Sequence, residues 1–344
     1  MAKPSKVLIS GYIGFENFGD DAVFSLLVNH LKNKGISVSA LSSNPSKTAK
    51  VYGVDAYKYK KFNEIYNAIS NTDILISGGG SLLQNTTSTG SLLYYLGIIF
   101  LAKLLGKKVI IFAQGIGPIK GNFYKFLTST ILKMTDLVTV RDRDSQNLLT
   151  KWGVKSKTVV DPVWSLPMPT HNPQNAIGIQ LRECKGIMKN SPIDFLYSIG
   201  DFYPDKEIKI FCLQNTQDFV FSRQFYTLLK QKYPNINAKV VSYTNPAKLL
   251  EEFATLERLI AMRFHACLVG LKMGVKVLPL SYDDKVTSFA REMQLPYVDI
   301  FKKNDYYQQL NDFYTYKEPE IVERKRKIKF DWEYFDKILD EEIK

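Results

Sequence analysis

Three glycine-bearing turns are the first part of this sequence that could carry chemistry. They read GYIGFENFGDD at residues 11–21, SGGGSLLQNTTS at 77–88 and AQGIGP at 113–118, and each directly follows an apolar run. Glycine lets a backbone approach a ligand closely or take a positive φ angle. Backbone N–H groups, with hydroxyl and amide side chains beside them, suit an anion or a sugar. The turns therefore predict a ligand site, with a tight structural connection as the alternative for each.

The spacing in the first turn narrows what it could bind. Its glycines, Gly11, Gly14 and Gly19, do not follow the GxGxxG pattern, so a dinucleotide site is not supported. Asp20 and Asp21 precede a helical stripe at residues 22–31, and either acid could cap that helix. We expect Asp21 to be the cap, which leaves Asp20 available for chemistry.

Basic residues follow other apolar runs. Arg141 directly follows the apolar run at 137–140. A guanidinium in that place can make a bidentate contact with a carboxylate or phosphate. An ion pair with a neighbouring aspartate is the alternative. Arg263 and His265 lie in MRFHACL, whose apolar frame makes a cation costly unless it has a partner. Lys285, in SYDDKV, follows one more run and is expected at the same edge.

The elements that must position these residues repeat along the chain. Apolar runs alternate with helical stretches, and most runs are continuous, as in a parallel sheet covered on both faces. Strand, helix and strand in repetition predict α/β layers of the Rossmann-like kind. The expected strands are residues 6–10, 37–41, 73–77, 108–113, 137–140 and 157–160, then 176–181, 207–212, 238–242, 258–261, 275–280 and 297–300.

One stretch breaks this rhythm and divides the chain. DPVWSLPMPTHNPQNA, at residues 161–176, is rich in proline and has no periodicity. We predict an N-terminal Rossmann-like domain at 1–165, a linker at 166–175, a C-terminal Rossmann-like domain at 176–317 and one C-terminal helix at 318–344. Parallel sheets bind ligands beyond the carboxyl ends of their strands, so we expect both domains to face a shared cleft.

The charge balance indicates which classes of partner the protein could bind. Lys and Arg number 46 against 34 Asp and Glu, a net charge of +12 that suggests an anionic partner, although solubility alone also explains it. The basic residues are dispersed and no nucleic-acid module is recognised, so we expect no nucleic acid. The apolar run at 92–102 is far shorter than the about 20 residues of a spanning helix. It predicts a buried helix or, alternatively, a surface for peripheral membrane contact.

The cysteines and the first residues bear on the compartment. Cys184, Cys212 and Cys267 form no CxxC pair, so neither a zinc site nor a disulfide framework is expected. Each is predicted to be a small core residue. No signal peptide is visible, because MAKPSKVLISG passes directly into a strand. We expect a cytoplasmic protein, and contact with the inner face of a membrane stays open.

Taken in order, seven motifs resemble the polysaccharide pyruvyl transferase family: GYIGFENFGDDA, SGGGSLLQNTTS, AQGIGPI, VRDRDS, DPVW, MRFHA and YDDKV. The resemblance spans residues 7–286 and is closest to bacterial ketal pyruvyltransferases of cell-wall polymers. It implies a GT-B-like α/β fold, phosphoenolpyruvate as co-substrate, and no cofactor or metal. It also implies a glycan acceptor, lipid-linked in the nearest part of the family, and a pyruvate ketal on two hydroxyls of one sugar.

The resemblance implies donor-binding residues. In the family an Arg, a His and a Lys engage the donor, and the motifs place them at Arg141, His265 and Lys285, with Arg263 beside them. Their charges suit the carboxylate and phosphate of phosphoenolpyruvate. His265 is the candidate general acid or phosphate partner.

With the donor placed there, the first two turns are expected to line the acceptor side. The candidate acceptor-binding residues are Asn17, Asp20, Gly79, Gly80 and Gln84. Asp20 is also the candidate catalytic base, and whether Asp20 or His265 protonates the donor methylene stays open. The chain has Asn85 where the family commonly has an acid, so no acid–base role is assigned there.

We therefore predict a transferase that moves pyruvate from phosphoenolpyruvate to a precursor of a cell-surface or secondary cell-wall polysaccharide. A nucleotide-sugar-dependent GT-B glycosyltransferase is the alternative enzyme, since a shared architecture does not fix function. A non-catalytic glycan-binding protein is the alternative from another class. Consumption of one donor or the other separates the two enzymes, and phosphate release separates the predicted enzyme from a binding protein.

Overall fold

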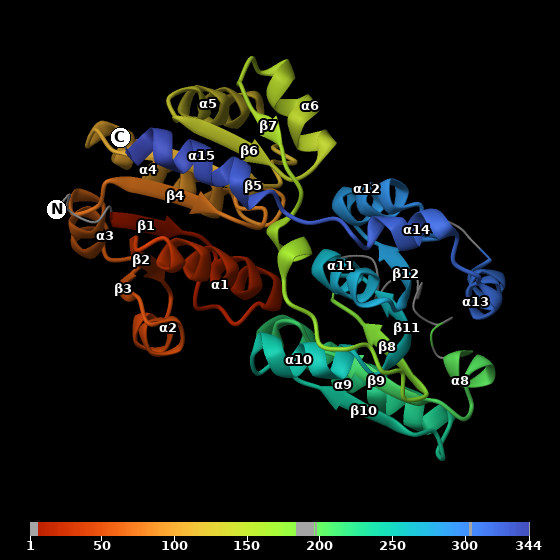
Figure 1. The fold of residues 1–344 in the computed structure, drawn as a ribbon. Helices are drawn as coiled ribbons and strands as arrows, with labels where there is room; N and C mark the ends of the chain where they lie inside the picture. Colours follow the sequence, from red (N-terminus) through yellow and green to blue (C-terminus); the bar gives the residue numbers. More distant parts are fainter. Residues whose placement is uncertain (1–5, 184–195, 197, 303–304, 344) are drawn as a thin grey trace. The chain divides into compact units, whose positions relative to one another are not determined.

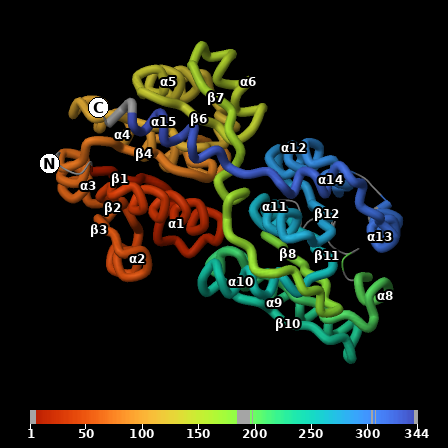
Figure 2. The backbone as a smooth tube through the Cα atoms, viewed as in Figure 1, coloured from red at the N-terminus to blue at the C-terminus, as the bar shows by residue number. Residues whose placement is uncertain are grey.

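The computed structural model describes residues 6–183, 196, 198–302 and 305–343 (Figure 1). The chain forms two compact units, Met1–Leu166 with Lys329–Lys344, and Pro167–Ile328. The backbone passes from the first unit to the second after Leu166, where the proline-rich stretch lies, and its last residues return to the first unit (Figure 2).

The first unit is built on a seven-stranded parallel sheet in the order β3-β2-β1-β4-β5-β6-β7. Its central strands are buried along almost their whole length because helices cover both faces. The strands are β1 (Lys6–Ser10), β2 (Ser37–Ser42), β3 (Asp55–Lys58), β4 (Ile74–Gly78), β5 (Lys108–Gln114), β6 (Leu137–Val140) and β7 (Lys157–Thr158).

Helices pack on both faces of this sheet. Residues of α3, α4, α5 and α6 share one core cluster with Ile111. Side chains alternate along a strand, so Phe112 points to the other face, where its ring lies 4.9 Å from that of Phe335 in α15. The helices of this unit are α1 (Phe18–Asn33), α2 (Pro45–Tyr52), α3 (Phe62–Ser70), α4 (Thr89–Leu104), α5 (Asn122–Lys133), α6 (Arg143–Lys151), the 3-10 helix η1 (Pro162–Ser165) and α15 (Trp332–Ile343).

The second unit repeats this plan with a six-stranded parallel sheet in the order β10-β9-β8-β11-β12-β13. Its strands are β8 (Ala176–Gln180), β9 (Glu207–Phe211), β10 (Ala238–Val241), β11 (Leu256–Ala261), β12 (Lys276–Ser281) and β13 (Val298–Asp299). Its helices are α8 (Ile199–Phe202), α9 (Asn215–Lys232), α10 (Pro246–Phe253), α11 (Phe264–Met273), α12 (Asp284–Met293), α13 (Tyr306–Thr315) and α14 (Glu320–Lys325).

Both sheets have the strand order of a Rossmann fold. In each, the first two crossovers run one way from the first strand and the later ones run the other way. The direction therefore reverses between β1 and β4 in the first sheet, and between β8 and β11 in the second. Ligands of such sheets bind outside the carboxyl ends of the strands at this reversal. The two α/β layers expected from the sequence are confirmed, and they put the predicted turns at these edges.

The expected cap of the first helix is wrong. Asn17, and not Asp21, is the N-cap of α1, and its side-chain oxygen accepts a hydrogen bond from the Gly19 N–H at 3.1 Å. The helix therefore begins at Phe18, four residues earlier than expected, with Asp20 and Asp21 in its first turn. Acids in that position are favourable because they face the positive end of the helix dipole.

The single C-terminal helix expected at 318–344 is also wrong. Two helices, α14 and α15, stand in its place. Between them Phe330 is buried, and its N–H donates to Ser165 Oγ at 2.9 Å. In α15, Trp332 stacks on His30 of α1 at 4.1 Å between ring centroids, and Asp336 lies 2.6 Å from His30 Nε2. These contacts fix α15 to the first unit. The short strand β3 was missed, since it is only partly buried.

Candidate functional site

The three glycine turns meet at the carboxyl edge of the first sheet, and their glycines are needed for that meeting. A Cβ on Gly80 would lie 2.5 Å from Asp20 Oδ1, and one on Gly115 would lie 2.7 Å from Ser81 Oγ. Gly79 and Gly80 also have positive φ angles of 61° and 68°. Any side chain there would clash or strain the backbone. The glycines thus serve loop packing, which brings polar atoms of different turns together.

Asp20 lies where the first two turns converge. It borders a small cavity of about 10 Å³, together with Gly11, Tyr12 and Gly79. That volume holds no more than about one water molecule, so a sugar could bind only outside it. Burial chiefly, and the nearby charge of Asp20 next, raise the pKa of Tyr95 well above the ordinary value. The structure therefore places Asp20 beside Gly79 and Gly80, as two turns of a single site would require.

A row of aromatic rings that was not expected from the sequence borders this edge. Tyr12 and Phe15 stack at 4.0 Å with an angle of 7° between their rings. Phe15 continues to Tyr59 at 5.4 Å, Tyr59 to Tyr94 at 5.7 Å, and Tyr94 to Tyr95 at 5.1 Å. Tyr12, Phe15 and Tyr59 are half-buried, so part of each ring is open to a ligand. The only local signal was the pair of rings in GYIGF.

The polar residues of the first two turns hold the loops in place. Asn17 caps α1, as described above. Gln84 Oε1 accepts hydrogen bonds from the backbone N–H of Thr86 at 2.8 Å and of Thr87 at 3.2 Å. Asn85 donates to the Lys120 carbonyl at 2.9 Å and accepts from its N–H at 2.7 Å, which ties the second turn to the segment after the third. These contacts give Asn17, Gln84 and Asn85 structural roles, and binding by Asn17 and Gln84 stays a prediction.

Arg141 follows β6 and is held inside the first unit. Its Nη1 lies 2.7 Å from Asp161 Oδ2, and its Nη2 donates to Ser81 Oγ at 3.0 Å. The two side chains of the ion pair are only 5% and 2% exposed. Asp142, its sequence neighbour, instead caps α6 by accepting from the Ser145 N–H at 2.7 Å. Arg141 thus pairs with the aspartate of DPVW, a partner not expected from the sequence.

Arg263 follows β11 and is held in the same way in the second unit. Its Nε and Nη2 donate to the carboxylate of Asp218 at 2.9 and 2.6 Å, and the Asp218 side chain is fully buried. Asp218 also accepts from two backbone N–H groups, those of Leu213 and Gln214. The Arg263 N–H donates to Gln180 Oε1 at 2.7 Å. This network fixes the end of β8 and the loops after β9 and β11 against one another.

A second arginine, Arg182, joins this edge and was missed. Its Nη1 donates to the Tyr282 hydroxyl at 3.2 Å. Burial first, and then the charge of Asp283, raise the pKa of Tyr282 to about 12, although the charges of Arg182 and Arg263 oppose the rise. The two arginines and Tyr282 are therefore electrostatic neighbours. The signal for Arg182 was its place directly after an apolar run, as for Arg141.

His265 and Lys285 begin the two helices that follow β11 and β12. Each is the second residue of its helix, α11 or α12, and each is half-buried. The helices contact each other, and Asp283 caps α12 by accepting from the Val286 N–H at 3.0 Å. Helix N-termini carry partial positive charge and bind anions. The edge of the second sheet therefore combines cationic side chains with two helix N-termini, which suits an anionic ligand.

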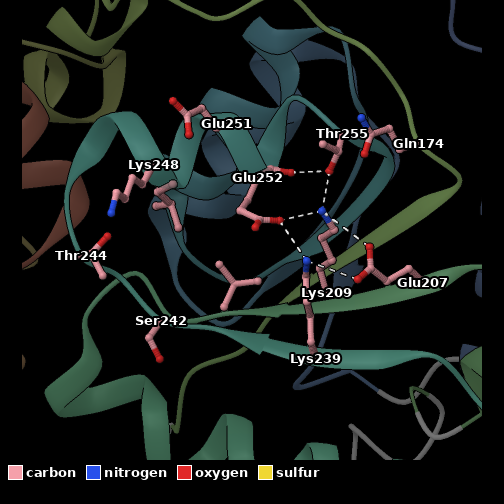
Figure 3. Close-up of a pocket in the computed structure, with 12 residues that line it drawn as sticks. Gln174, Glu207, Lys209, Lys239, Ser242, Thr244, Lys248, Glu251, Glu252 and Thr255 are labelled. Carbon is pink, nitrogen blue, oxygen red and sulfur yellow. Dashed lines mark hydrogen bonds and ion pairs between the residues drawn. The ribbon is translucent and has the colours of Figure 1, made fainter.

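A larger cavity, of about 480 Å³, lies elsewhere in the second unit, beside α10 and the strands β9 and β10 (Figure 3). Lys209 Nζ lies 2.6 Å from Glu252 Oε2, and Lys239 Nζ lies 3.3 Å from Glu207 Oε1. None of the predicted site residues lines it. Its lining holds as many glutamates as lysines, so it offers an anion no excess positive charge.

In the described part of the chain, no group of three or more His, Cys, Asp or Glu side chains could hold a metal ion. Cys212 and Cys267 are free and buried, and Cys184 lies outside the described residues. No helix within that part is long and apolar enough to cross a bilayer.

Comparison with known proteins adds a family and a fold. A family model described as polysaccharide pyruvyl transferase matches residues 17–284, whereas no curated protein matches the chain. Among solved structures, UDP-GlcNAc 2-epimerase from Methanocaldococcus jannaschii is similar, with a TM-score of 0.64 and 11% identity over 92% of this chain and 94% of that one. Anabaena HepE, solved with UDP and glucose, has a TM-score of 0.64 and 10% identity over 98% and 99%.

These structural likenesses show the fold alone. A putative UDP-N-acetylglucosamine 2-epimerase from Listeria monocytogenes gives a similar result, with a TM-score of 0.63 and 11% identity over 94% of this chain and 91% of that one. The shared plan is the GT-B arrangement of two parallel α/β sheets expected from the sequence. Because one fold hosts many reactions, the chemistry must be argued from the residues at the two sheet edges.

Proposed function

Because this chain belongs to the polysaccharide pyruvyl transferase family, whose members transfer pyruvyl groups to polysaccharides, we propose that phosphoenolpyruvate is its donor. The product is a pyruvate ketal on two hydroxyls of one sugar in a cell-surface or secondary cell-wall polysaccharide precursor. One observation carries the proposal: Arg182, Arg263, His265 and Lys285 gather at the carboxyl edge of the second sheet, at two helix N-termini.

The donor fits this edge by charge. Phosphoenolpyruvate carries a carboxylate and a phosphate on one small carbon skeleton, so it needs several positive groups within a short distance. The Lys285 ammonium suits one anion, and His265 with the N–H groups opening α11 suits the other, since no side chain caps α11 and its first turn holds no acid. Arg263 holds its loop through Asp218, so we assign it a positioning role.

The reaction then proceeds through two cationic states at C2 of the donor. A proton is added to the methylene carbon, the C2 cation is attacked by one sugar hydroxyl, and that hydroxyl loses its proton. Phosphate then leaves with the electrons of the C2–O bond, and the second hydroxyl attacks C2, loses its proton and closes the ketal. Positive groups that hold the leaving phosphate stabilise this departure. The net change consumes one phosphoenolpyruvate and one diol and releases one phosphate.

The acceptor side is assigned to the edge of the first sheet. Asp20 supplies a carboxylate beside Gly79 and Gly80, where it can take a hydroxyl proton. The open parts of Tyr12, Phe15 and Tyr59 offer flat apolar surface for the C–H face of a sugar ring. His265 remains the candidate general acid. Arg141, held by Asp161, is assigned to positioning of the second and third turns through Ser81.

The test is incubation of the purified protein with phosphoenolpyruvate and a panel of saccharide acceptors, including lipid-linked ones. We expect phosphate release and a pyruvyl increment on one acceptor in the mass spectrum. Asp20→Asn should abolish both, whereas Glu16→Gln, at an exposed carboxylate of the same turn, should keep them.

Two other results would overturn the proposal. Consumption of a nucleotide sugar in place of phosphoenolpyruvate would identify a glycosyltransferase. Protection of the protein against heat by phosphoenolpyruvate and glycan, with no phosphate released by any acceptor, would identify a binding protein.

A further inference from the structure

The outer face of α4 and α5 exposes large apolar side chains that the proposed reaction does not use. Leu93, Phe100 and Leu104 of α4 and Phe123 and Phe126 of α5 are between 41% and 69% exposed. We call this set the α4–α5 face. Soluble proteins expose apolar residues singly, so a contiguous group of this size indicates an interaction surface.

The α4–α5 face is contiguous because of helical geometry. In α4 the exposed positions recur as Leu93, Gly97, Phe100 and Leu104, three or four residues apart, which is one stripe of a helix. In α5 Phe123 and Phe126 begin a similar stripe. The two helices contact each other on the same face of the sheet. The opposite stripe of each is buried in the core, so neither helix is free to turn its apolar side inward.

Charge on these two helices has one sign. Neither the α4 sequence nor the α5 sequence contains an acid, while Lys125 and Lys133 are exposed on α5 and Lys120 just precedes it. On the other face of the same sheet, α15 carries Glu333, Asp336 and Asp340. The α4–α5 face is therefore apolar with lysines as its charged residues.

We propose that the α4–α5 face docks on an anionic phospholipid surface. Aromatic and aliphatic side chains enter the headgroup region while lysines beside them meet anionic headgroups, which is how peripheral amphipathic surfaces bind membranes. With 16 residues, α4 is too short to span a bilayer and so lies along its surface. A symmetric contact between two copies would instead bring lysines of one against lysines of the other, which is unfavourable.

The test is flotation of the full chain with vesicles of phosphatidylcholine alone or mixed with phosphatidylglycerol. We expect binding to the mixed vesicles that weakens with added salt. The double variant Phe123→Ser/Phe126→Ser should lower the vesicle affinity at least about tenfold, since two rings that would enter the headgroup region are lost. Lys125→Gln and Lys133→Gln should each lower it about fivefold. The matched control is Val51→Ser, at a 60%-exposed apolar residue of α2, and it should bind as the wild type does.

Two further results would overturn the docking proposal. One is equal flotation of the wild type and the double variant, or no flotation of either, in samples whose circular dichroism shows intact folding. The other is a fall in solution mass on Phe123→Ser/Phe126→Ser without vesicle binding, which would identify the α4–α5 face as a contact between copies. Because flotation needs neither donor nor acceptor, its failure leaves the proposed pyruvyl transfer standing, and the reverse also holds.

Discussion

The carboxyl edges of the two sheets share a buried arginine–aspartate pair and differ in the residues around it. Each holds an arginine after a strand, Arg141 after β6 and Arg263 after β11, and each arginine is buried against an aspartate. Around Arg141 stand glycine turns, aromatic rings and Asp20. Around Arg263 stand Arg182, Tyr282 and two helix N-termini.

Because each edge holds such an arginine, the arginine alone does not indicate which ligand an edge binds. A guanidinium committed to a buried carboxylate positions loops, and a ligand must be recognised by the groups that surround the pair. Those groups differ in sign and character, which is the basis for placing an anionic donor at one edge and a sugar at the other.

The largest expected effect is on stability, from removal of one partner of either buried pair. Asp218→Ala and Asp161→Ala should each lower the free energy of unfolding by about 3–5 kcal/mol, because each strands a buried guanidinium. Urea unfolding measures the loss. Glu16→Ala, which breaks an exposed pair with Lys47, is the control and should cost at most about 1 kcal/mol. A small loss for only one of the two aspartates would show that the arginines are not equivalent.

The next largest expected effect is on kcat, and it distinguishes His265 from His171. His265→Ala should lower kcat about 10²–10⁴-fold, the range expected for a lost general acid. His171, also in the second unit, lies 2.8 Å from the Leu256 carbonyl through Nε2, and His171→Asn is the matched control. Steady-state phosphate release gives both rates. An unchanged kcat for His265→Ala would remove His265 from the reaction.

The separation of donor and acceptor can be sharpened by a reciprocal pair of variants. Lys285→Ala should raise KM for phosphoenolpyruvate about 10–100-fold, because a hydrogen bond to a charged group is lost. Phe15→Ala should raise KM for the glycan about tenfold through loss of ring contact, and leave KM for the donor unchanged. Initial rates with each substrate varied in turn provide the four constants. If both variants moved the same KM, the division between the edges would fail.

The smallest effect concerns Asn17. Asn17→Ala should cost about 1 kcal/mol of stability through loss of the α1 cap, and Asn17→Asp should retain most of it. Thermal unfolding gives the stability, and the KM for the glycan reports any binding role. A rise in that KM for Asn17→Asp, in a protein of unchanged stability, would support the predicted contact with the sugar.

Local patterns predicted much of this protein. Apolar runs, most of them continuous, marked 12 of the 13 strands that the described residues form, because burial on both faces of a parallel sheet leaves few polar positions in most strands. The missed strand, β3, is short and partly exposed, so its residues lack that signal. The α4 sequence was expected to be either a buried helix or a surface. The helix is buried along one stripe and exposed along the other. Because both stripes are apolar, the sequence could not indicate which one is buried.

The sequence by itself determined the two α/β layers, the turns at their edges and the family, since each rests on short-range pattern and motif. Only the tertiary structure decided the partners. Arg141 meets Asp161 20 residues away, and Arg263 meets Asp218 45 residues away. The strand order brings these residues together, and many other acids lie as near in sequence. The packing of the two sheets therefore decides which charged side chains are neutralised inside the fold and which can contact a ligand.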